Sequence, residues 1–217
     1  MHTLIISGGT IDTDFALDLL KKERFDHIIG VDGGLKFCYE QKIVPTRIVG
    51  DFDTLEPEIL VWYQTHTQIE IRQFNPVKDA TDTQIAVELA MELGSSQITV
   101  LGATGTRLDH VLGNIQTLYL PYTKEIDCSI VDVHNRIRLV SGELHLKKAE
   151  QWGKYVSLIP FTTNAEGVTL KGFKYPLEHY HFTVMGTGSL GVSNEIAEEE
   201  AVIQIEKGIM ILLESKD

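Results

Sequence analysis

The feature that most constrains the fold is a change in the pattern of expected strands and helices near residue 120. Up to that point, short apolar runs typical of strands alternate with stretches of helical periodicity, a pattern that indicates βαβ units and a parallel sheet. After about residue 124 the segments are short, and turn residues such as Asn135 and Gly142 separate them without helical runs between. The sequence therefore predicts an α/β domain with a mostly parallel, Rossmann-like sheet over residues 1–123. An all-β sandwich or barrel is expected over residues 124–217.

The expected elements follow from this patterning. Strands of the first domain are expected at 3–6, 27–31, 47–49, 70–74 and 97–101, with helices at 15–22, 35–41, 56–64 and 83–93. A further helix is expected from residue 107, with a buried stripe formed by Leu108, Val111, Leu112, Ile115, Leu118 and Tyr119. Strands of the second domain are expected at 129–133, 136–140, 144–146, 155–159, 167–170, 181–184, 202–205 and 208–213.

One of these helices has a clear start signal. Ile85, Leu89 and Leu93 recur every four residues and form one apolar face. Thr81 and Gln84 fit the S/T-x-x-E/Q capping box. A helix is therefore expected to begin close to a run of polar residues, 78–82.

Composition narrows the class of partner and the compartment. The formal charge of −12 opposes binding to a nucleic acid, and no Lys/Arg cluster offsets it. No run of about 18 apolar residues suggests a membrane-spanning helix, and the N-terminus lacks the basic start and apolar core of a signal peptide. Cys38 and Cys128 stand far apart without metal-like spacing, so both are expected to be reduced. We expect a cytoplasmic protein with no membrane and no nucleic-acid partner.

Four Asp-bearing motifs lie in the first half of the chain, and three of them directly follow apolar runs. They are residues 32–34 (Asp-Gly-Gly), 50–54 (Gly-Asp-Phe-Asp-Thr), 78–82 (Lys-Asp-Ala-Thr-Asp) and 107–110 (Arg-Leu-Asp-His). Residues just past the carboxyl ends of parallel strands line the ligand crevice of an open α/β sheet. Crowded carboxylates need a cation to stay ionised, and Mg²⁺ bound by carboxylates and substrate phosphates is the usual one. The motifs indicate a Mg²⁺-dependent phosphate-transfer site.

Each motif also has a structural explanation. Asp51 and Asp53 can converge on one cation, or they can cap backbone amides in a Gly-Asp turn. Haloacid-dehalogenase-like phosphatases also carry D-x-D after a strand, but they place Thr or Val four residues after the first Asp, whereas Thr54 is three residues on. Asp32 and Gly33 equally fit a tight strand-to-helix turn.

The other two motifs stand at expected helix starts. Lys78 could accompany phosphate oxygens docked on a helix N-terminus, whereas Thr81 or Asp82 could be a cap only. The Gly-rich link 102–107 suits close backbone approach to a phosphate or nucleoside, but it is neither a Walker A loop nor G-x-G-x-x-G.

The residues around that link have their own candidate roles. Gly105 lies within it, Arg107 at its end could clamp phosphates, and Asp109 could bind substrate or metal. We expect His110 to be a helix-terminus residue whose hydrogen bonds are satisfied, and prefer this to a role as a proton shuttle. In the second half, Ser193 and Asn194 offer neutral donors and acceptors for a heteroaromatic ligand, or belong to a long hairpin.

Taken together and in this order, the motifs resemble those of the bacterial thiamine pyrophosphokinase family. The resemblance covers essentially the whole chain, with two departures: Thr54 where Ser is usual and Thr106 where Gly is usual. It implies transfer of the diphosphate of ATP to the hydroxyl of thiamine, with release of AMP, by a homodimer. The active site would form where the α/β domain of one chain meets the β domain of the other.

The resemblance also implies residue roles. Asp51, Asp53 and Asp82 would hold Mg²⁺ and, with Asp109, form the catalytic set. ATP would be bound by Asp32, Gly33, Lys78, Thr81, Gly105, Arg107 and His110. Asp109, Ser193 and Asn194 would contact thiamine. Two other functions stay open: another Mg²⁺-dependent phosphotransferase or phosphatase, and a non-catalytic thiamine or nucleotide sensor.

Overall fold

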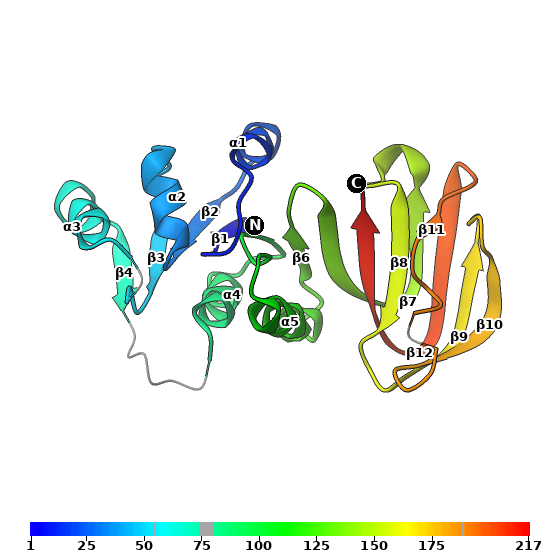
Figure 1. Cartoon of the computed structure of the whole chain (residues 1–217). Helices are drawn as coiled ribbons and strands as arrows, with labels where there is room; N and C mark the ends of the chain where they lie inside the picture. Colours follow the sequence, from blue (N-terminus) through cyan, green and yellow to red (C-terminus); the bar gives the residue numbers. More distant parts are fainter. Residues whose placement is uncertain (54, 74–79, 188) are drawn as a thin grey trace. The chain divides into compact units, whose positions relative to one another are not determined.

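The chain folds into two compact units, Met1–Val133 and His134–Asp217, called here the α/β unit and the β unit. The structure is a computed structural model that describes residues 1–53, 55–73, 80–187 and 189–217 (Figure 1). Lys78, Asp79 and Thr54, all named above, lie outside the described residues. None of the described helices combines the length and the apolar character needed to cross a bilayer.

The α/β unit is built on a parallel sheet with strand order β6-β5-β1-β2-β3-β4. Its strands are β1 (His2–Ile6), β2 (His27–Val31), β3 (Arg47–Gly50), β4 (Glu70–Gln73), β5 (Gln97–Leu101) and β6 (Asp127–Val131). Its helices are α1 (Thr13–Lys22), α2 (Gly34–Glu40), α3 (Pro57–His66), α4 (Asp82–Glu92), α5 (Leu108–Thr117) and α6 (Tyr119–Tyr122). Figure 1 shows α1, α2 and α3 on one face of the sheet, and α4 and α5 on the other. The expected α/β domain is confirmed.

Burial explains why the central strands read as continuous apolar runs. Leu4, Ile5 and Ile6 are consecutive residues of β1 and are each 0% exposed. Because successive side chains of a strand point to opposite faces, both faces of the sheet must be covered, as parallel sheets require.

The start of α4 confirms half of the predicted capping box. The Thr81 hydroxyl accepts a hydrogen bond from the backbone N–H of Gln84, 3.2 Å away. The Gln84 side chain, however, donates to Glu88 one turn further along the helix instead of returning to the cap.

The prediction of a buried apolar stripe on the helix after residue 107 is wrong in part. Leu108 is 71% exposed, Leu112 63% and Tyr119 44%, whereas the polar Asn114 and Thr117 are buried. Helical periodicity identifies an apolar face but not what covers it, and here the face turned to the sheet includes polar side chains that bond to the backbone.

The strand expected at 129–133 belongs to the α/β unit and not to the second domain. It is β6, which pairs parallel with β5 in the register Gln97↔Asp127 to Leu101↔Val131. Helices α5 and α6 form the crossover between them, so the βαβ pattern continues for one more strand than predicted. The division between the units follows Val133, later than the expected boundary at 123/124.

The β unit is an antiparallel sandwich organised around one long strand. Its elements are β7 (Asn135–Lys147), the 3₁₀ turn η1 (Lys148–Glu150), β8 (Tyr155–Pro160), β9 (Asn164–Lys171), β10 (Leu177–Thr183), β11 (Asn194–Glu195) and β12 (Glu200–Ser215). The first half of β12 pairs with β7 and β9, and the second half pairs with β7 and β8. Phe182, Ile203, Met210 and Leu212, all 0% exposed, lie in the core between the layers. The expected sandwich is confirmed.

Gly142 was expected in a turn and Gly208 at the start of a strand, but both lie inside longer strands. Gly142, with φ +66°, lies within β7, and Gly208, with φ +94°, lies within β12. The β7–β12 register shifts between Ile205 and Met210. Glycine at positive φ in a continuous strand is typical of a bulge that bends it, so each pair of predicted strands is a single strand.

Candidate active site

A cavity of the α/β unit lies where the predicted motifs converge. Its volume is about 610 Å³, in the range of small-molecule sites. The loops that follow β1, β2, β3 and β5 line it, together with the first turns of α4 and α5. The carboxyl ends of the parallel strands therefore form a crevice, as an open α/β sheet predicts.

Close backbone approach fixes two of these loops against each other. The N–H of Gly9 donates to the carbonyl of Gly102 at 2.7 Å, and that of Thr10 to the carbonyl of Thr104 at 2.8 Å. A Cβ added at Gly9 would lie 2.3 Å from the Thr104 oxygen, so no other residue fits there without a shift. These contacts continue the β1–β5 pairing beyond the strands and hold the Gly-rich link 102–107 at the cavity.

Three carboxylates gather at the ends of β2 and β3. Asp32, Asp51 and Asp53 each offer an oxygen, and these oxygens lie within 4.8 Å of one another. Phe52 between the two β3 aspartates is buried, and its φ of +61° turns the backbone so that Asp51 and Asp53 converge. Asp51 also accepts a hydrogen bond from the N–H of Asp53 at 3.2 Å. The donor set, three carboxylate oxygens, is chemically suited to Mg²⁺.

The composition of this group differs from the metal set expected from the sequence. Asp82 lines the same cavity, at the first residue of α4, but is not a member of the group. Asp32, expected to contact ATP, is a member instead. The signal in the sequence was its position directly after the buried strand β2, equivalent to that of Asp51 after β3.

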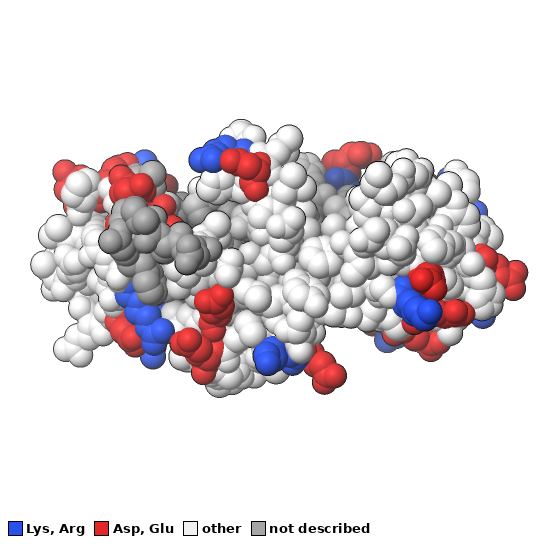
Figure 2. Space-filling model, turned by 90° about the horizontal axis from the view of Figure 1, so that it is seen from below, with Lys and Arg blue, Asp and Glu red and all other residues white. Residues whose placement is uncertain are grey.

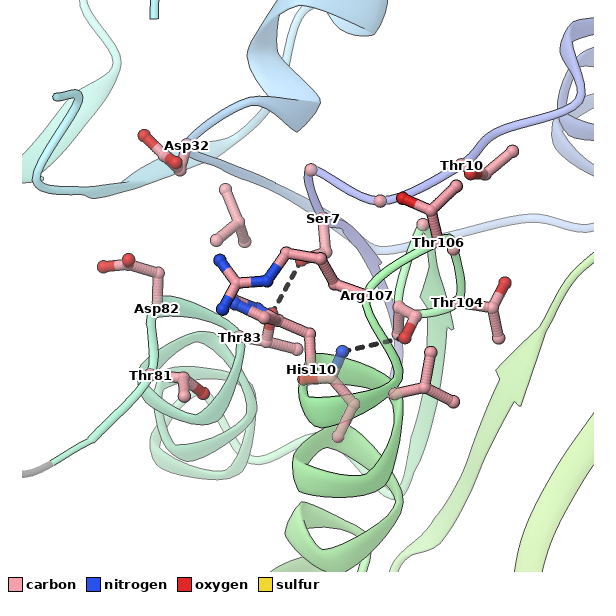
Figure 3. A pocket seen from close by; sticks show the side chains of 18 of the residues that line it. Ser7, Thr10, Asp32, Thr81, Asp82, Thr83, Thr104, Thr106, Arg107 and His110 are labelled. Carbon is pink, nitrogen blue, oxygen red and sulfur yellow. Dashed lines mark hydrogen bonds between the residues drawn. The ribbon is translucent and has the colours of Figure 1, made fainter. Parts of the chain in front are cut away.

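Arg107 and Asp109 form a forked ion pair at the mouth of the cavity. Arg107 Nε lies 3.2 Å from Asp109 Oδ1, and Nη2 lies 2.6 Å from Oδ2. Hydrogen bonding to the Arg107 guanidinium lowers the pKa of Asp109 to about 2. Both side chains are well exposed, at 69% and 66%. Figure 3 shows the guanidinium extending toward the side of the cavity where Asp82 and Asp32 lie.

The other predicted residues of this unit are distributed around the cavity. Thr81, Gly105 and His110 line it. Gly33 is not among the residues that line the cavity, and a Cβ added there would lie 3.4 Å from the Cα of Gly8. Lys78 is among the residues that the structure does not describe.

Several hydroxyl and amide side chains of the cavity were not predicted. The Asn114 side chain donates to the carbonyl of Ala103 at 2.8 Å, and the hydroxyls of Ser7 and Thr83 lie 2.7 Å apart. Figure 3 shows the interaction between Ser7 and Thr83 as a dashed line. Ser7 had one usable signal, its position directly after a buried strand, whereas Thr83 and Asn114 look like ordinary helix residues in the sequence.

In the β unit, Ser193 and Asn194 lie at a chain reversal and differ in how they are engaged. Asn194 is buried; its amide donates to the carbonyl of Tyr175 at 2.8 Å, and its carbonyl accepts from the Tyr175 N–H at 3.0 Å. Ser193 is exposed with φ +61°, and its N–H donates to the Ser157 hydroxyl at 2.9 Å. Asn194 fastens two chain segments together, while the Ser193 side chain faces outward.

The chain matches two family models. Residues 16–130 match "Thiamin pyrophosphokinase, catalytic domain", and residues 141–210 match "Thiamin pyrophosphokinase, vitamin B1 binding domain". The chain belongs to the thiamine pyrophosphokinase family. It is 35% identical over 195 residues to the thiamine pyrophosphokinase of Bacillus subtilis, with 87% of each chain covered.

Solved structures of thiamine pyrophosphokinases share the fold over the whole chain. The Bacillus subtilis structure has a TM-score of 0.86 at 32% identity and covers 100% of both chains. The Geobacillus thermodenitrificans structure has a TM-score of 0.85 at 31% identity and covers 100% of this chain and 98% of that one. The catalytic-domain match falls inside the α/β unit, and the vitamin B1 match falls inside the β unit.

Proposed function

We propose that this chain transfers the diphosphate group of ATP to the hydroxyl of thiamine, giving thiamine diphosphate and AMP. The family of the chain supports ATP-dependent formation of thiamine diphosphate. The observation that carries the proposal is the convergence of Asp32, Asp51 and Asp53 at a cavity between helix starts and a Gly-rich link. Phosphate transfer needs such a site, since its catalysis is mostly positioning and electrostatic stabilisation.

We assign Mg²⁺ to the three converging carboxylates, with Asp82, the first residue of α4, as a further ligand. Carboxylates within 4.8 Å of one another repel unless a cation or proton intervenes, so the donor set fits the ion. When bound, Mg²⁺ would neutralise charge on the phosphate oxygens. The contribution of the chain is to hold these four aspartates at fixed strand and helix ends.

The phosphates of ATP are assigned to the side of the cavity that carries donors. Arg107 would clamp phosphate oxygens with its fork, and Lys78 would add a second cation. Thr81 and Gly105 would bring their backbones close to the nucleotide, Gly33 would permit the approach of the loop after β1, and His110 would contact ATP from α5.

Asp109 is assigned to thiamine as an acceptor that orients the attacking hydroxyl. With a pKa of about 2 it is ionised at neutral pH and is a weak base. Arg107 must leave Asp109 or share it when phosphates bind, because the same guanidinium nitrogens serve both.

Ser193 and Asn194 are assigned to the thiamine ring from the β unit. The exposed Ser193 hydroxyl would meet the ligand directly, and Asn194 would hold this reversal in place through Tyr175. The positive charge of thiamine favours a cleft with surplus carboxylates.

We further infer a cytoplasmic homodimer in which each site combines the α/β unit of one chain with Ser193 and Asn194 of the other. The exposed apolar face of α5 and α6, formed by Leu108, Leu112 and Tyr119, supports a protein–protein interface. Mixing Asp53→Ala chains with Asn194→Ala chains should then restore activity, because one of the two sites in a mixed dimer carries neither lesion. Absence of rescue after confirmed subunit exchange would mean that a single chain builds each site.

One assay separates this function from the alternatives. Purified protein is incubated with ATP and Mg²⁺, with and without thiamine, and the nucleotide products are separated. The proposal predicts AMP only when thiamine is present. Formation of ADP or free phosphate would indicate another phosphotransferase or phosphatase, and binding without turnover would indicate a sensor.

A further inference from the structure

A buried pair of hydroxyls joins two elements at the floor of the cavity. The Ser7 and Thr83 hydroxyl oxygens lie 2.7 Å apart, and the two residues are 6% and 8% exposed. Ser7 directly follows β1, and Thr83 is the second residue of α4. Both line the cavity, and Figure 3 shows their bond as a dashed line. A hydrogen bond in such a buried position is costly to leave unmade.

A second pair of the same kind joins the same two elements at their other ends. The Thr3 and Ser95 hydroxyls lie 2.6 Å apart, and the residues are 0% and 3% exposed. Thr3 lies four residues before Ser7. Because side chains along a strand alternate between the two faces of the sheet, Thr3 and Ser7 point to the same face. Ser95 follows the end of α4. Helix α4 is therefore tied to β1 at both ends, and neither Thr3 nor Ser95 lines the cavity.

The tie at the cavity end fixes the residues that begin α4. Thr81 caps the helix and Asp82 is its first residue, so both stand directly before Thr83 and both line the cavity. Movement of this helix end would shift the Asp82 carboxylate and the backbone N–H groups of the first turn together. Misplacement of a positioning group by about 1 Å can cost about a hundredfold in rate.

We propose that Ser7 and Thr83 are positioning residues that hold the start of α4, and thereby Asp82 and Thr81, against the polyphosphate and metal of the bound nucleotide. The inference rests on the proposed function for the identity of the ligand. Its distinctive consequence is that the two hydroxyl pairs contribute alike to the fold, while only the Ser7–Thr83 pair sets the nucleotide geometry.

The test compares the two pairs in the full chain. Thr83→Val and Ser7→Ala remove one hydroxyl each, and Thr83→Ser keeps it. Thr3→Val and Ser95→Ala are the matched controls in the same strand and after the same helix. For each protein we would measure the thermal midpoint, the affinity for ATP with Mg²⁺ by calorimetry without thiamine, and the KM values for ATP and thiamine.

Thr83→Val should raise the Kd and KM for ATP about tenfold, the equivalent of one buried hydrogen bond, and the KM for thiamine less than about twofold. Thr83→Ser should recover most of the loss. The double variant Ser7→Ala/Thr83→Val should bind ATP no more weakly than the weaker single variant, because one bond is lost in all three. The controls should lower the thermal midpoint by a similar amount and leave the affinity for ATP unchanged.

Equal losses of ATP affinity in the control pair, or unchanged ATP affinity in Thr83→Val, would overturn the positioning role. If the native protein forms no AMP with thiamine, the proposed function fails, but calorimetry with ATP still decides whether the pair shapes the site. If Thr83→Val does not fold, Ser7→Ala and Thr83→Ser carry the comparison.

Discussion

The α/β unit gathers like charges, with Asp32, Asp51 and Asp53 oxygens within 4.8 Å of one another, whereas the β unit surrounds its buried carboxylate with cations. Glu214 is 1% exposed; it accepts from Arg136 Nε at 2.8 Å and from Arg138 at 3.4 Å, and it also accepts from the N–H of Trp152 at 3.2 Å. The ion pairs and hydrogen bonds of Glu214 offset the cost of its burial. The carboxylates of the α/β unit repel one another, which is the basis of the proposed Mg²⁺ site.

The two units also differ in how they use polar residues at chain reversals. In the α/β unit, Asp51 and Asp82 line the cavity, and Asp51 also accepts from the backbone N–H of Asp53. In the β unit, the Asn194 side chain itself pairs with the backbone of Tyr175. On the face shown in Figure 2, acidic and basic side chains form small mixed groups and no broad basic field among the residues described.

The largest effect should come from a variant of the carboxylate group. Asp53→Ala should lower kcat by about a thousandfold or more, because loss of a metal ligand raises the barrier by several kcal/mol. Asp53 is exposed, so the thermal midpoint should not change. Kinetics over a range of Mg²⁺ concentrations test this, with Asp18→Ala, which removes a surface carboxylate paired with Lys22 at 2.7 Å, as the control. Near-normal activity of Asp53→Ala at any Mg²⁺ concentration would contradict the assignment of Asp53 as a metal ligand.

The buried carboxylate of the β unit should behave in the opposite way. Glu214→Gln should destabilise this unit by about 3 kcal/mol, since it leaves two arginines without their shared anion. The rate per folded molecule should be kept. Denaturant unfolding measures the loss, and Glu166→Gln, whose exposed partner Lys207 lies 3.4 Å away, should cost less than about 1 kcal/mol. Equal stability of the two variants would contradict the structural role of Glu214.

Variants of Ser193 and Asn194 should separate an effect on thiamine binding from an effect on the stability of the fold. Asn194→Ala should cost about 1–3 kcal/mol of stability, because it removes a buried side chain that makes two hydrogen bonds to the backbone of Tyr175. Ser193→Ala should cost less than about 0.5 kcal/mol, as exposed substitutions do. Both should raise the KM for thiamine more than that for ATP. An effect on ATP alone would contradict the assignment of thiamine to the β unit.

The sequence predicted the elements best where a strand is buried on both faces. The strand expected at 97–101 coincides with β5, and Asp51 and Asp53 were identified because they follow such a strand. The pairing of strands was harder to predict. The apolar run at 129–133 looks the same in the sequence whether the neighbouring strand is parallel or antiparallel, and only the fold shows that β6 pairs with β5.

The part of the site that escaped prediction depends on contacts between distant segments. Ser7 and Thr83 are 76 residues apart in the chain, and nothing in either local pattern indicates the other. Asn114 was not among the predicted site residues, although its amide holds the Gly-rich link through Ala103. The resemblance assigned Asp32 to ATP, and its closeness to Asp51 depends on how β2 and β3 pair, which the local pattern does not show.

The smallest effect concerns the exposed pair of Arg107 and Asp109. Because the pKa of Asp109 is lowered to about 2 in the folded protein, the stabilisation from this pair is present above the unfolded pKa of about 3.9 and is lost as the pH falls through about 2. Carboxyl NMR titration should show Asp109 ionised at pH 4, and Arg107→Ala should return its pKa toward 3.9. An unchanged titration in Arg107→Ala would show that the two side chains are not paired in solution.

The central claim is that the chain moves a diphosphate group as one unit. ATP labelled with ³²P at the β-phosphorus tests this most directly, in the presence of Mg²⁺ and thiamine. Transfer of the diphosphate predicts that the label moves into thiamine diphosphate, in step with the appearance of unlabelled AMP. Label that stays in ADP while thiamine gains a single phosphate, or label released as free phosphate, would contradict the account.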